Sequence, residues 1–277
     1  KQYEKSEELV KKCIQLSTTS STIWKSLGNI KMQTGATEEA IAAYKKSLSY
    51  DPNQFDLIAS IRKLEKKPES YQLFPIVEEI KIINADKAAP KESEYGYYSL
   101  LDQKDVIVYE NRAAEEFITY MIKITKENGV DQYKELTLDE GSIIEKAEII
   151  KTGSRIKGEL NGNEIVFTNL EPNDVIFIRY KLQSYNTGPF AKEFTDKLFF
   201  DGFIYGALTK YTLIVPEHLK LNFLFSKKDI KPNITSIENF KKYTWEIANA
   251  EPIDSEPLMP NLVDVGNTLH ISTISDW

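Results

Sequence analysis

The sequence predicts a multidomain protein in which an N-terminal α-helical segment is followed by an all-β antiparallel sandwich. Up to about residue 70, apolar residues recur every three or four positions, as on amphipathic helices. From residue 96 onward they alternate with polar residues, as in strands buried on one face. The 277 residues are enough for two ordinary domains. We therefore expect helical repeats at residues 1–70, a linker at 71–95 and the β-sandwich at 96–277.

Within the helical segment, residues 21–54 carry the pattern of a two-helix repeat. Its elements are a Trp-x2-Leu-Gly start at Trp24, an Ala-x3-aromatic pair at Ala40 and Tyr44, and a closing proline at Pro52. The small residues let two antiparallel helices approach closely, and the aromatic rings fill the wedge between them. This segment resembles the tetratricopeptide repeat.

One helix is expected before this repeat and one after it. Ser6, Val10 and Cys13 would line the inner face of the first, and residues 55–64 would form the second. Because about three repeats are needed to bury a continuous core, we expect the segment to be the end of a longer, truncated array.

The candidate binding residues of this segment are Lys25, Asn29 and Met32, on the first helix of the repeat. The family resemblance implies a protein or peptide ligand on this face. Some relatives clamp a C-terminal carboxylate with a lysine and an asparagine spaced like Lys25 and Asn29, one helical turn apart. The alternative is a face covered by neighbouring repeats or by the next domain, with Met32 in a packing role.

Residues 71–83 are expected to form one more helix, and residues 84–94 an exposed linker. The predicted strands are residues 97–101, 106–109, 116–125, 143–151, 154–160, 164–168, 175–182, 196–200, 203–215, 221–225 and 243–248. Turns are predicted where Asn, Asp, Gly and Pro gather, at 102–105, 128–129, 161–163, 171–174, 186–189 and 201–202. Strands at this spacing, without alternating helices, indicate a sandwich or a related antiparallel barrel.

An ordered series of short motifs in residues 97–277 is similar to a bacterial domain of unknown function that precedes a transglutaminase-like core. The motifs include Leu170-Glu-Pro-Asn-Asp174 leading into a strand, Gly188-Pro189-Phe190, Tyr243-Thr-Trp245 and His270-Ile-Ser-Thr273. The resemblance implies a downstream transglutaminase-like domain in cis, beyond Trp277. It also implies a bacterial protein, for which an exported or periplasmic location is favoured over the cytoplasm.

The residues that a papain-like core needs do not occur together in this sequence, so no catalytic residue is assigned. Cys13 is expected to be a buried small residue, and His218 and His270 are 52 positions apart. No cofactor is expected, and one cysteine and two histidines give little material for a metal site.

Three acidic groups are candidates for other chemistry: Glu115 with Glu116, Asp139 with Glu140, and Glu251 with Asp254 and Glu256. Paired carboxylates serve as glycosidase dyads or calcium ligands. The sequence favours a solvated surface for all three, and an extended strap for the proline-rich stretch 251–260.

Charge argues against nucleic acid as a partner. Residues 1–70 hold 12 Lys+Arg against 9 Asp+Glu, whereas residues 71–277 hold 23 against 33, and this acidic part repels phosphate. No apolar run has the roughly 18 residues of a membrane span, so no membrane insertion by this segment is expected.

The sequence thus predicts a non-catalytic segment for protein interaction and positioning within a larger transglutaminase-like protein, a papain-like cysteine peptidase or amidase. One alternative is a glycoside or peptide hydrolase that uses carboxylates of the β domain. Another is a free-standing peptide-binding adaptor that uses Lys25 and Asn29.

Overall fold

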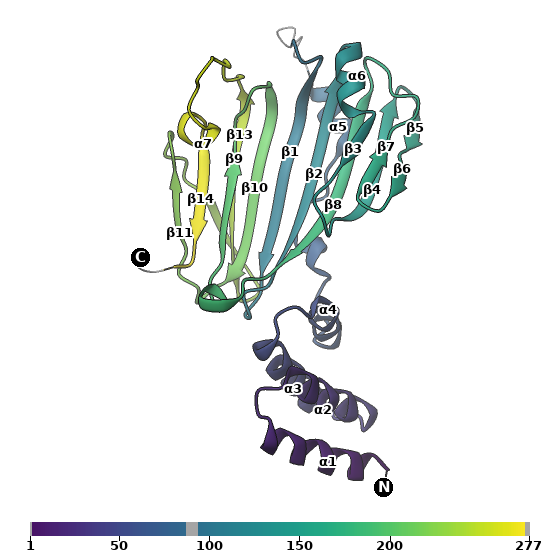
Figure 1. Ribbon diagram of the computed structural model, residues 1–277, viewed down its shortest axis with the longest axis vertical. Coiled ribbons are helices and arrows are strands. Elements are labelled where there is room, and N and C mark those ends of the chain that lie inside the picture. Colours follow the sequence, from purple (N-terminus) through teal and green to yellow (C-terminus); the bar gives the residue numbers. More distant parts are fainter. Residues whose placement is uncertain (1, 87–93, 275–277) are drawn as a thin grey trace. The chain divides into compact units, whose positions relative to one another are not determined.

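The computed structural model describes residues 2–86 and 94–274 (Figure 1). Within these ranges the chain divides into two compact units. One runs as far as Pro75 and includes Glu110–Ala113 and Ser184–Lys192, and the other holds the remaining residues. Among the described residues, no helix combines the length and the apolar character needed to cross a membrane.

The N-terminal unit is helical, as predicted. Its helices are α1 (Gln2–Leu16), α2 (Ser21–Gln33), α3 (Thr37–Tyr50), α4 (Phe55–Leu64) and the 3-10 helix η1 (Ser70–Leu73). After α2 the chain turns at Gly35, whose φ of +78° is a left-handed conformation that glycine adopts without a Cβ clash. This turn brings α3 back against α2, so that the two form a helical hairpin.

The close approach predicted for this hairpin is found where Gly28 meets Tyr44. A Cβ atom at Gly28 would lie 2.3 Å from two carbons of the Tyr44 ring, so the contact requires glycine. Ala40 is completely buried beside it. The Tyr44 hydroxyl donates a hydrogen bond of 2.8 Å to Oδ1 of Asn29, which ties the two helices together at their edge.

Two expectations for this part of the chain are wrong. Cys13 is exposed, because Ile14, one turn after the half-buried Val10, takes the inner position that was assigned to the cysteine. The helix expected at 71–83 is interrupted by Pro75, before which Phe74 is extended. The chain becomes helical again only in α5 (Glu79–Ala85). Residues 87–93 of the expected linker lie outside the described residues.

The second unit is built on an eight-stranded sheet with the order β12-β13-β10-β1-β2-β8-β4-β5. Its strands are β1 (Tyr97–Val108), β2 (Ala114–Ile124), β4 (Ile143–Lys151), β5 (Ser154–Lys157), β8 (Val175–Ser184), β10 (Gly206–Pro216), β12 (Asn233–Ile237) and β13 (Phe240–Ala250). β1 pairs with β2 in antiparallel fashion but with β10 in parallel. The predicted antiparallel β domain is therefore confirmed as a mostly antiparallel one.

Two three-stranded sheets stand side by side in front of the large sheet (Figure 1). One has the order β11-β14-β9, with β9 (Thr195–Phe199), β11 (Asn222–Phe225) and β14 (Thr268–Ser272). The other has the order β3-β7-β6, with β3 (Glu135–Thr137), β6 (Glu159–Asn161) and β7 (Glu164–Val166), and α6 (Glu127–Tyr133) precedes it. The short helix α7 (Leu262–Val265) also belongs to this unit, whereas η2 (Gly188–Phe190) belongs to the first unit.

Each small sheet has its own apolar core against the large one. Trp245 and Tyr211 of the large sheet pack with Phe200 and Leu269 on one side. On the other side, the core includes Ile149, Ile165, Phe167, Ile176 and Ile178. Between these two cores, the large sheet carries polar side chains of β1 and β2, among them Asp102, Lys104 and Glu116.

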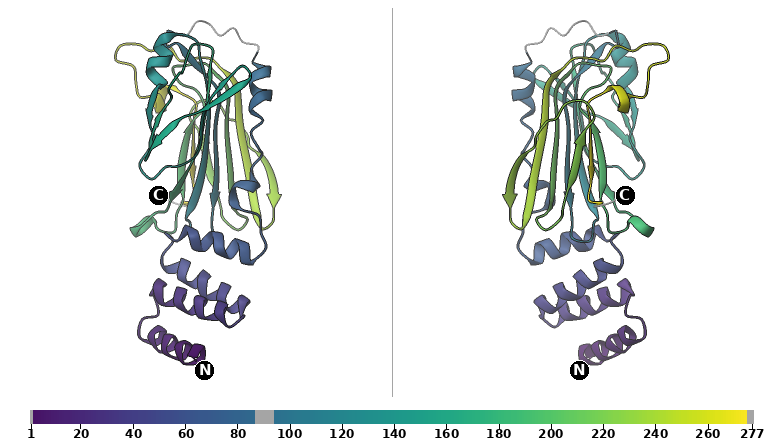
Figure 2. Two further views of the ribbon diagram at one scale, coloured as in Figure 1. Left: turned by 90° about the vertical axis from the view of Figure 1, so that its right-hand side faces the viewer. Right: turned by 90° about the vertical axis from the view of Figure 1, so that its left-hand side faces the viewer.

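Helix α5 covers the opposite face of the large sheet (Figure 2). Ile82 and Ile83 of this helix pack against a cluster that includes Leu100, Met121 and Phe177. The large sheet is therefore covered on both faces, which explains why its central strands bury side chains pointing in both directions.

Two of the predicted turns are wrong, and both errors concern the middle of the β domain. Residues 102–105 do not turn but continue β1, in register with β2 from Asp102 opposite Tyr120 to Asp105 opposite Phe117. Residues 128–129 lie in α6. A Cβ at Gly129 would lie 2.1 Å from the carbonyl oxygen of Gly96, so the glycine serves a close backbone approach instead of a hairpin.

Candidate functional site

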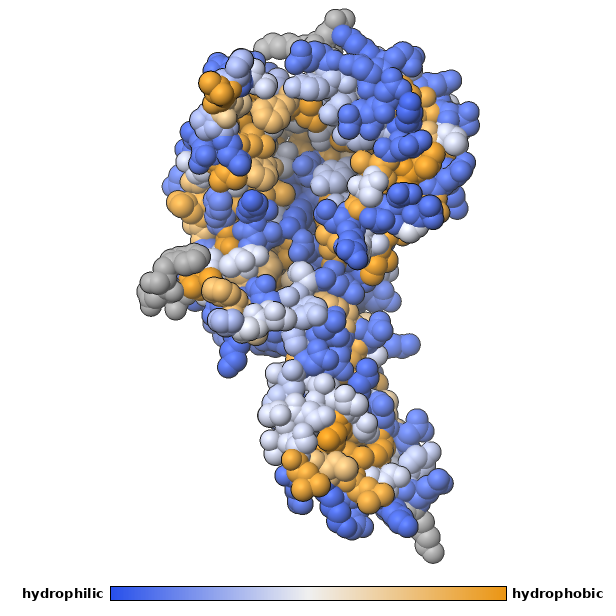
Figure 3. Space-filling view, viewed as in Figure 1, coloured by the Kyte–Doolittle hydropathy of each residue, from blue (hydrophilic) through white to orange (hydrophobic). Residues whose placement is uncertain are grey.

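A groove runs down the front of the β domain between the two small sheets. Figure 3 shows this face hollowed along its middle, with hydrophilic residues there and apolar residues on both flanks. The strands that border it are β9 and β3, each the last strand of its small sheet (Figure 1). We call this feature the central groove, and its floor is formed by alternate residues of β1 and β2.

An ion-pair cluster occupies the floor of the central groove beside β9. Lys104 Nζ lies 2.8 Å from Glu116 Oε2 and 2.8 Å from Asp196 Oδ1. The Tyr211 hydroxyl donates a hydrogen bond of 2.6 Å to the other oxygen of Asp196. Burial disfavours the Lys104 ammonium, but the charges of Asp196 and Glu116 outweigh it and raise the lysine pKa. The cluster thus holds a charged lysine between two carboxylates.

Next to this cluster, Asp102 is surrounded by tyrosines. Tyr120 is its cross-strand neighbour, and the charge of Asp102 also acts on Tyr133 and Tyr180. Burial raises the pKa of Asp102 to about 6, and the attraction of Lys104 only partly offsets this effect. Across the described residues, no side chain or backbone group donates a hydrogen bond to this carboxylate.

These three tyrosines belong to two ring pairs, of which Tyr97 is the fourth member. The rings of Tyr97 and Tyr133 meet edge to face at 4.8 Å between centroids, and those of Tyr120 and Tyr180 are 6.2 Å apart. Burial first, and the Asp102 charge second, raise the pKa of Tyr120 well above its ordinary range. The groove therefore combines neutral aromatic walls with a carboxylate that is difficult to ionise.

The sequence did not reveal this site, and one of its acidic predictions is wrong. Glu115 and Glu116 were expected in solvent. Glu115 is instead buried on the opposite face, where Lys181 Nζ lies 3.2 Å from its carboxylate, while Glu116 pairs with Lys104. Asp139 is exposed, and its charge acts on Tyr120 and Tyr180. The sequence did contain one signal for the site, because the polar residues Asp102 and Lys104 alternate along the chain and so lie on one face of a strand.

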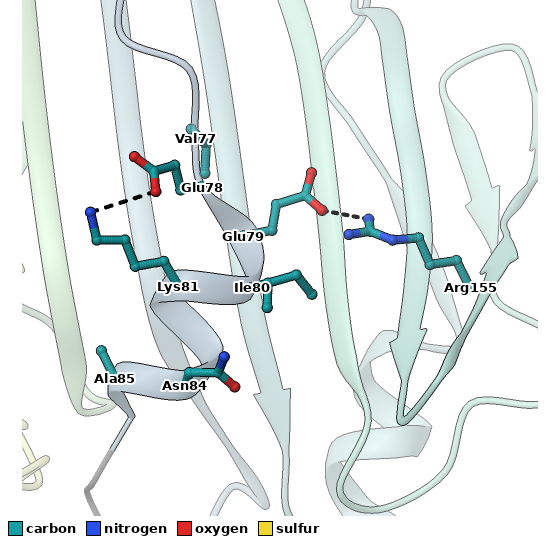
Figure 4. Close-up of a pocket in the computed structure, with 8 residues that line it drawn as sticks. All are labelled: Val77, Glu78, Glu79, Ile80, Lys81, Asn84, Ala85 and Arg155. Atoms are coloured by element: carbon teal, nitrogen blue, oxygen red, sulfur yellow. Dashed lines mark ion pairs between the residues drawn. The ribbon is translucent and has the colours of Figure 1, made fainter.

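A second, shallow hollow lies over α5 on the other face of the large sheet (Figure 4). Its lining consists of Val77, Glu78, Glu79, Ile80, Lys81, Asn84, Ala85 and Arg155. Glu79 forms ion pairs with Arg155 and with Lys146, the latter at 2.9 Å. These ion pairs of Glu79 hold α5 against β4 and β5, so the charged residues of this hollow have a structural role.

The predicted binding residues of the helical unit lie on α2. Lys25 and Asn29 are both exposed, and Met32 is half-buried. Asn29 already accepts the hydrogen bond from Tyr44. The carboxylate clamp remains a prediction.

The residues that were considered for nucleophilic or metal chemistry are not brought together. Cys13 is on α1, His218 follows β10, and His270 lies within β14 opposite Leu224. In the part of the chain that the structure describes, no three His, Cys, Asp or Glu side chains form a group suited to a metal ion.

Two family models match parts of the chain. Residues 22–54 match the tetratricopeptide repeat, and residues 164–254 match a domain of unknown function with a solved structure, DUF3857. No curated protein matches the chain. The two predicted resemblances are confirmed in the predicted order, whereas the transglutaminase-like core remains a prediction.

Solved structures that match part of the chain come from bacterial peptidases and a provisionally named protease. The latter, from Parabacteroides distasonis, matches with a TM-score of 0.57 and 15% identity over 65% of this chain and 41% of that one. An M1 zinc metallopeptidase from Deinococcus radiodurans matches with a TM-score of 0.36 and 10% identity over 64% of this chain and 42% of that one. Legionella pneumophila aminopeptidase A has a TM-score of 0.38 and 11% identity over 65% of this chain and 22% of its own.

Of these, only the Parabacteroides structure is similar enough to show a shared fold, and this chain spans less than half of its length. According to the two family matches, the chain carries a tetratricopeptide repeat at residues 22–54, followed by a DUF3857 domain at residues 164–254.

Proposed function

We propose that this chain is a non-catalytic recognition and positioning segment of a larger bacterial protein with a transglutaminase-like core, a papain-like cysteine peptidase or amidase. The helical repeats bind a protein or peptide, and the β domain supports the core in cis. The order of the two matched domains supports this proposal, as does a fold shared with part of a longer, provisionally named protease.

The non-catalytic part of the proposal rests on one observation, that the groove carboxylates Glu116 and Asp196 are already bound by a lysine. Glu116 and Asp196 both bind the same half-buried lysine, Lys104, at 2.8 Å. A general base or a nucleophile must be available to a substrate atom, whereas these two oxygens are held by an ammonium group. The arrangement stabilises the junction of β1, β2 and β9.

The proposal is tested by turnover assays on the purified chain with a mixed peptide library, aryl esters and aryl glycosides. We expect no product above the buffer rate. Turnover that disappears on Glu116→Gln or Asp196→Asn, while both variants keep the wild-type circular dichroism spectrum, would reject the proposal.

One observation favours hydrolysis as a second candidate function. Asp102 has a raised pKa of about 6 and shares the central groove with the carboxylates of Glu116 and Asp196. Glycosidases likewise combine a carboxyl group of raised pKa, which acts as the acid, with an ionised carboxylate, which acts as the base or nucleophile. If this candidate is right, aryl glycoside turnover is found and Asp102→Asn lowers it by roughly a hundredfold or more. Turnover insensitive to Asp102→Asn eliminates it.

The adaptor alternative rests on the exposure of Lys25 and Asn29 on one face of α2. It predicts that peptides with a free C-terminal carboxylate bind, and that Lys25→Ala weakens binding by about tenfold because a charge-assisted hydrogen bond is lost. Gln33→Ala, another exposed position of α2, is the matched control. Equal binding of C-terminally amidated peptides would eliminate a carboxylate clamp.

A further inference from the structure

We propose that the central groove binds an extended peptide and places one of its lysine or arginine side chains against Asp102, between the tyrosines. This inference goes beyond the proposed function, because it assigns a ligand to the β domain itself. Four features of the groove support it.

The first feature is the unfulfilled hydrogen-bonding capacity of Asp102. An ionised carboxylate accepts several hydrogen bonds, and one such as Asp102, which is partly removed from water and has no protein donors, is costly. Among the described residues none donates to Asp102, and Lys104, the cation whose attraction it feels, is bound at 2.8 Å by both Glu116 and Asp196. A ligand that brings N–H donors and positive charge would satisfy this side chain.

The second feature is the aromatic wall. Tyr120 stands directly across the strand pair from Asp102. The Asp102 charge also acts on Tyr133 and Tyr180, whose rings pair with those of Tyr97 and Tyr120. Aromatic faces attract organic cations, and the attraction grows as the cation is desolvated. Because burial raises the pKa of all four tyrosines, they are neutral hydroxyl-bearing walls and do not compete for a cation as phenolates.

The third feature is local charge, which selects the chemical class of the ligand. Asp102 and Glu116 on the floor, Asp196 on β9 and Asp139 nearby outnumber Lys104. A hard metal ion would require several converging oxygens, and no such group occurs in the described ranges. A primary ammonium or a guanidinium supplies both N–H donors and charge, whereas a quaternary ammonium has no donors for Asp102.

The fourth feature is the shape of the site, which favours an extended peptide over a small amine. β9 and β3 end their sheets, and Figure 1 shows these two strands as the inner edges on either side of the groove. The unpaired backbone groups of an edge strand can hydrogen-bond to an added strand. A peptide running along the groove would therefore pair with an edge while its side chain reached the floor.

The test is a calorimetric titration of the full chain with a blocked pentapeptide that has a central lysine between valines. Analogues with central norleucine and central trimethyllysine are titrated in parallel. We expect the lysine peptide to bind at least roughly tenfold more tightly than either analogue, because each lacks the charged N–H donors. Asp102→Asn should remove this preference, and Asp229→Asn, an exposed aspartate that pairs with Lys231, should keep it.

Equal affinity for the lysine and norleucine peptides would overturn the proposal, as would a lysine preference that survives Asp102→Asn. Trimethyllysine binding as tightly as lysine would overturn the role of N–H donors at Asp102. Variants are compared only after their circular dichroism spectra are shown to match the wild type. Turnover of glycosides or peptides would reject the non-catalytic function without affecting this result, so that the two proposals fail separately.

Discussion

At the scale of single residues, Asp102 is the side chain whose properties depend most on its surroundings. An aspartate in an unfolded chain has a pKa of about 3.9, whereas burial raises that of Asp102 to about 6. The folded state therefore holds the proton more tightly than the unfolded state. Protonated Asp102 is compatible with the folded state below about pH 4, where the stability that depends on this proton is fully present. That stability is lost as the pH rises through 6.

This sign leads to a prediction for Asp102→Asn. At pH 7.5 the variant should be more stable than the wild type, with a free energy of unfolding about 1–2 kcal/mol higher. The reason is that an uncharged amide replaces an ionised and poorly solvated carboxylate. This gain is smaller than the full pKa shift would give, because Asp102 is partly exposed to water. Urea unfolding at pH 7.5 and pH 4 measures it, and the difference should nearly vanish at pH 4. A destabilised variant at pH 7.5 would contradict the assigned environment.

Gly28 gives a second prediction at this scale. Gly28→Ala would place a methyl group 2.3 Å from the Tyr44 ring, which is buried and holds Asn29 by a hydrogen bond. We expect α2 and α3 to separate and the helical unit to lose about 1–3 kcal/mol of stability. Hydrogen exchange of the amides of these helices measures the loss. Ser26→Ala, two positions earlier on α2, is the control and should change exchange little.

At the scale of elements, the sequence predicts local patterns better than long-range contacts. The α2–α3 hairpin was predictable because Trp24, Gly28, Ala40 and Tyr44 lie within one repeat and each contributes to one interface. The central groove was not predictable in this way. Residues 102–105 contain two aspartates and a lysine, a composition typical of turns, and only pairing with β2 and β10 makes them a strand. That pairing and the contact with Asp196, 92 positions from Lys104, are non-local.

Helix α5 shows how an element with little propensity is stabilised by its contacts. It has only seven residues, too few for an isolated helix, and its position depends on Ile82 and Ile83 and on the ion pairs of Glu79. Glu79→Gln should weaken the attachment by about 1 kcal/mol, the upper range for an ion pair that is only partly buried.

Hydrogen exchange of the α5 amides should therefore quicken about fivefold in Glu79→Gln, while exchange in β1 and β2 stays unchanged. Glu78→Gln is the matched control, since its partner Lys81 lies at 3.5 Å and both side chains are exposed. If the two variants behave alike, the ion pairs with Arg155 and Lys146 do not hold the helix.

At the scale of the whole molecule, each unit has the exposed surface on which its proposed binding role rests. The helical unit carries one matched repeat with an exposed Lys25 and Asn29, and the β domain has a groove lined by tyrosines and carboxylates. Of the groups that a hydrolase would combine, Cys13 belongs to α1 and His270 to β14, and the groove carboxylates Glu116 and Asp196 are bound by Lys104. The proposed recognition role accounts for these features together, whereas bond cleavage accounts only for the raised pKa of Asp102.

The most direct measurement is the chemical fate of a bound ligand. The blocked lysine pentapeptide is held with an excess of the full chain at pH 7.5 for a day, and the bound and free fractions are then analysed by mass spectrometry. We expect the peptide to be retained by the wild type, to be released by Asp102→Asn and to be recovered intact from both. Cleaved peptide that forms with the wild type and not with Asp102→Asn would contradict a recognition role and assign the groove to catalysis.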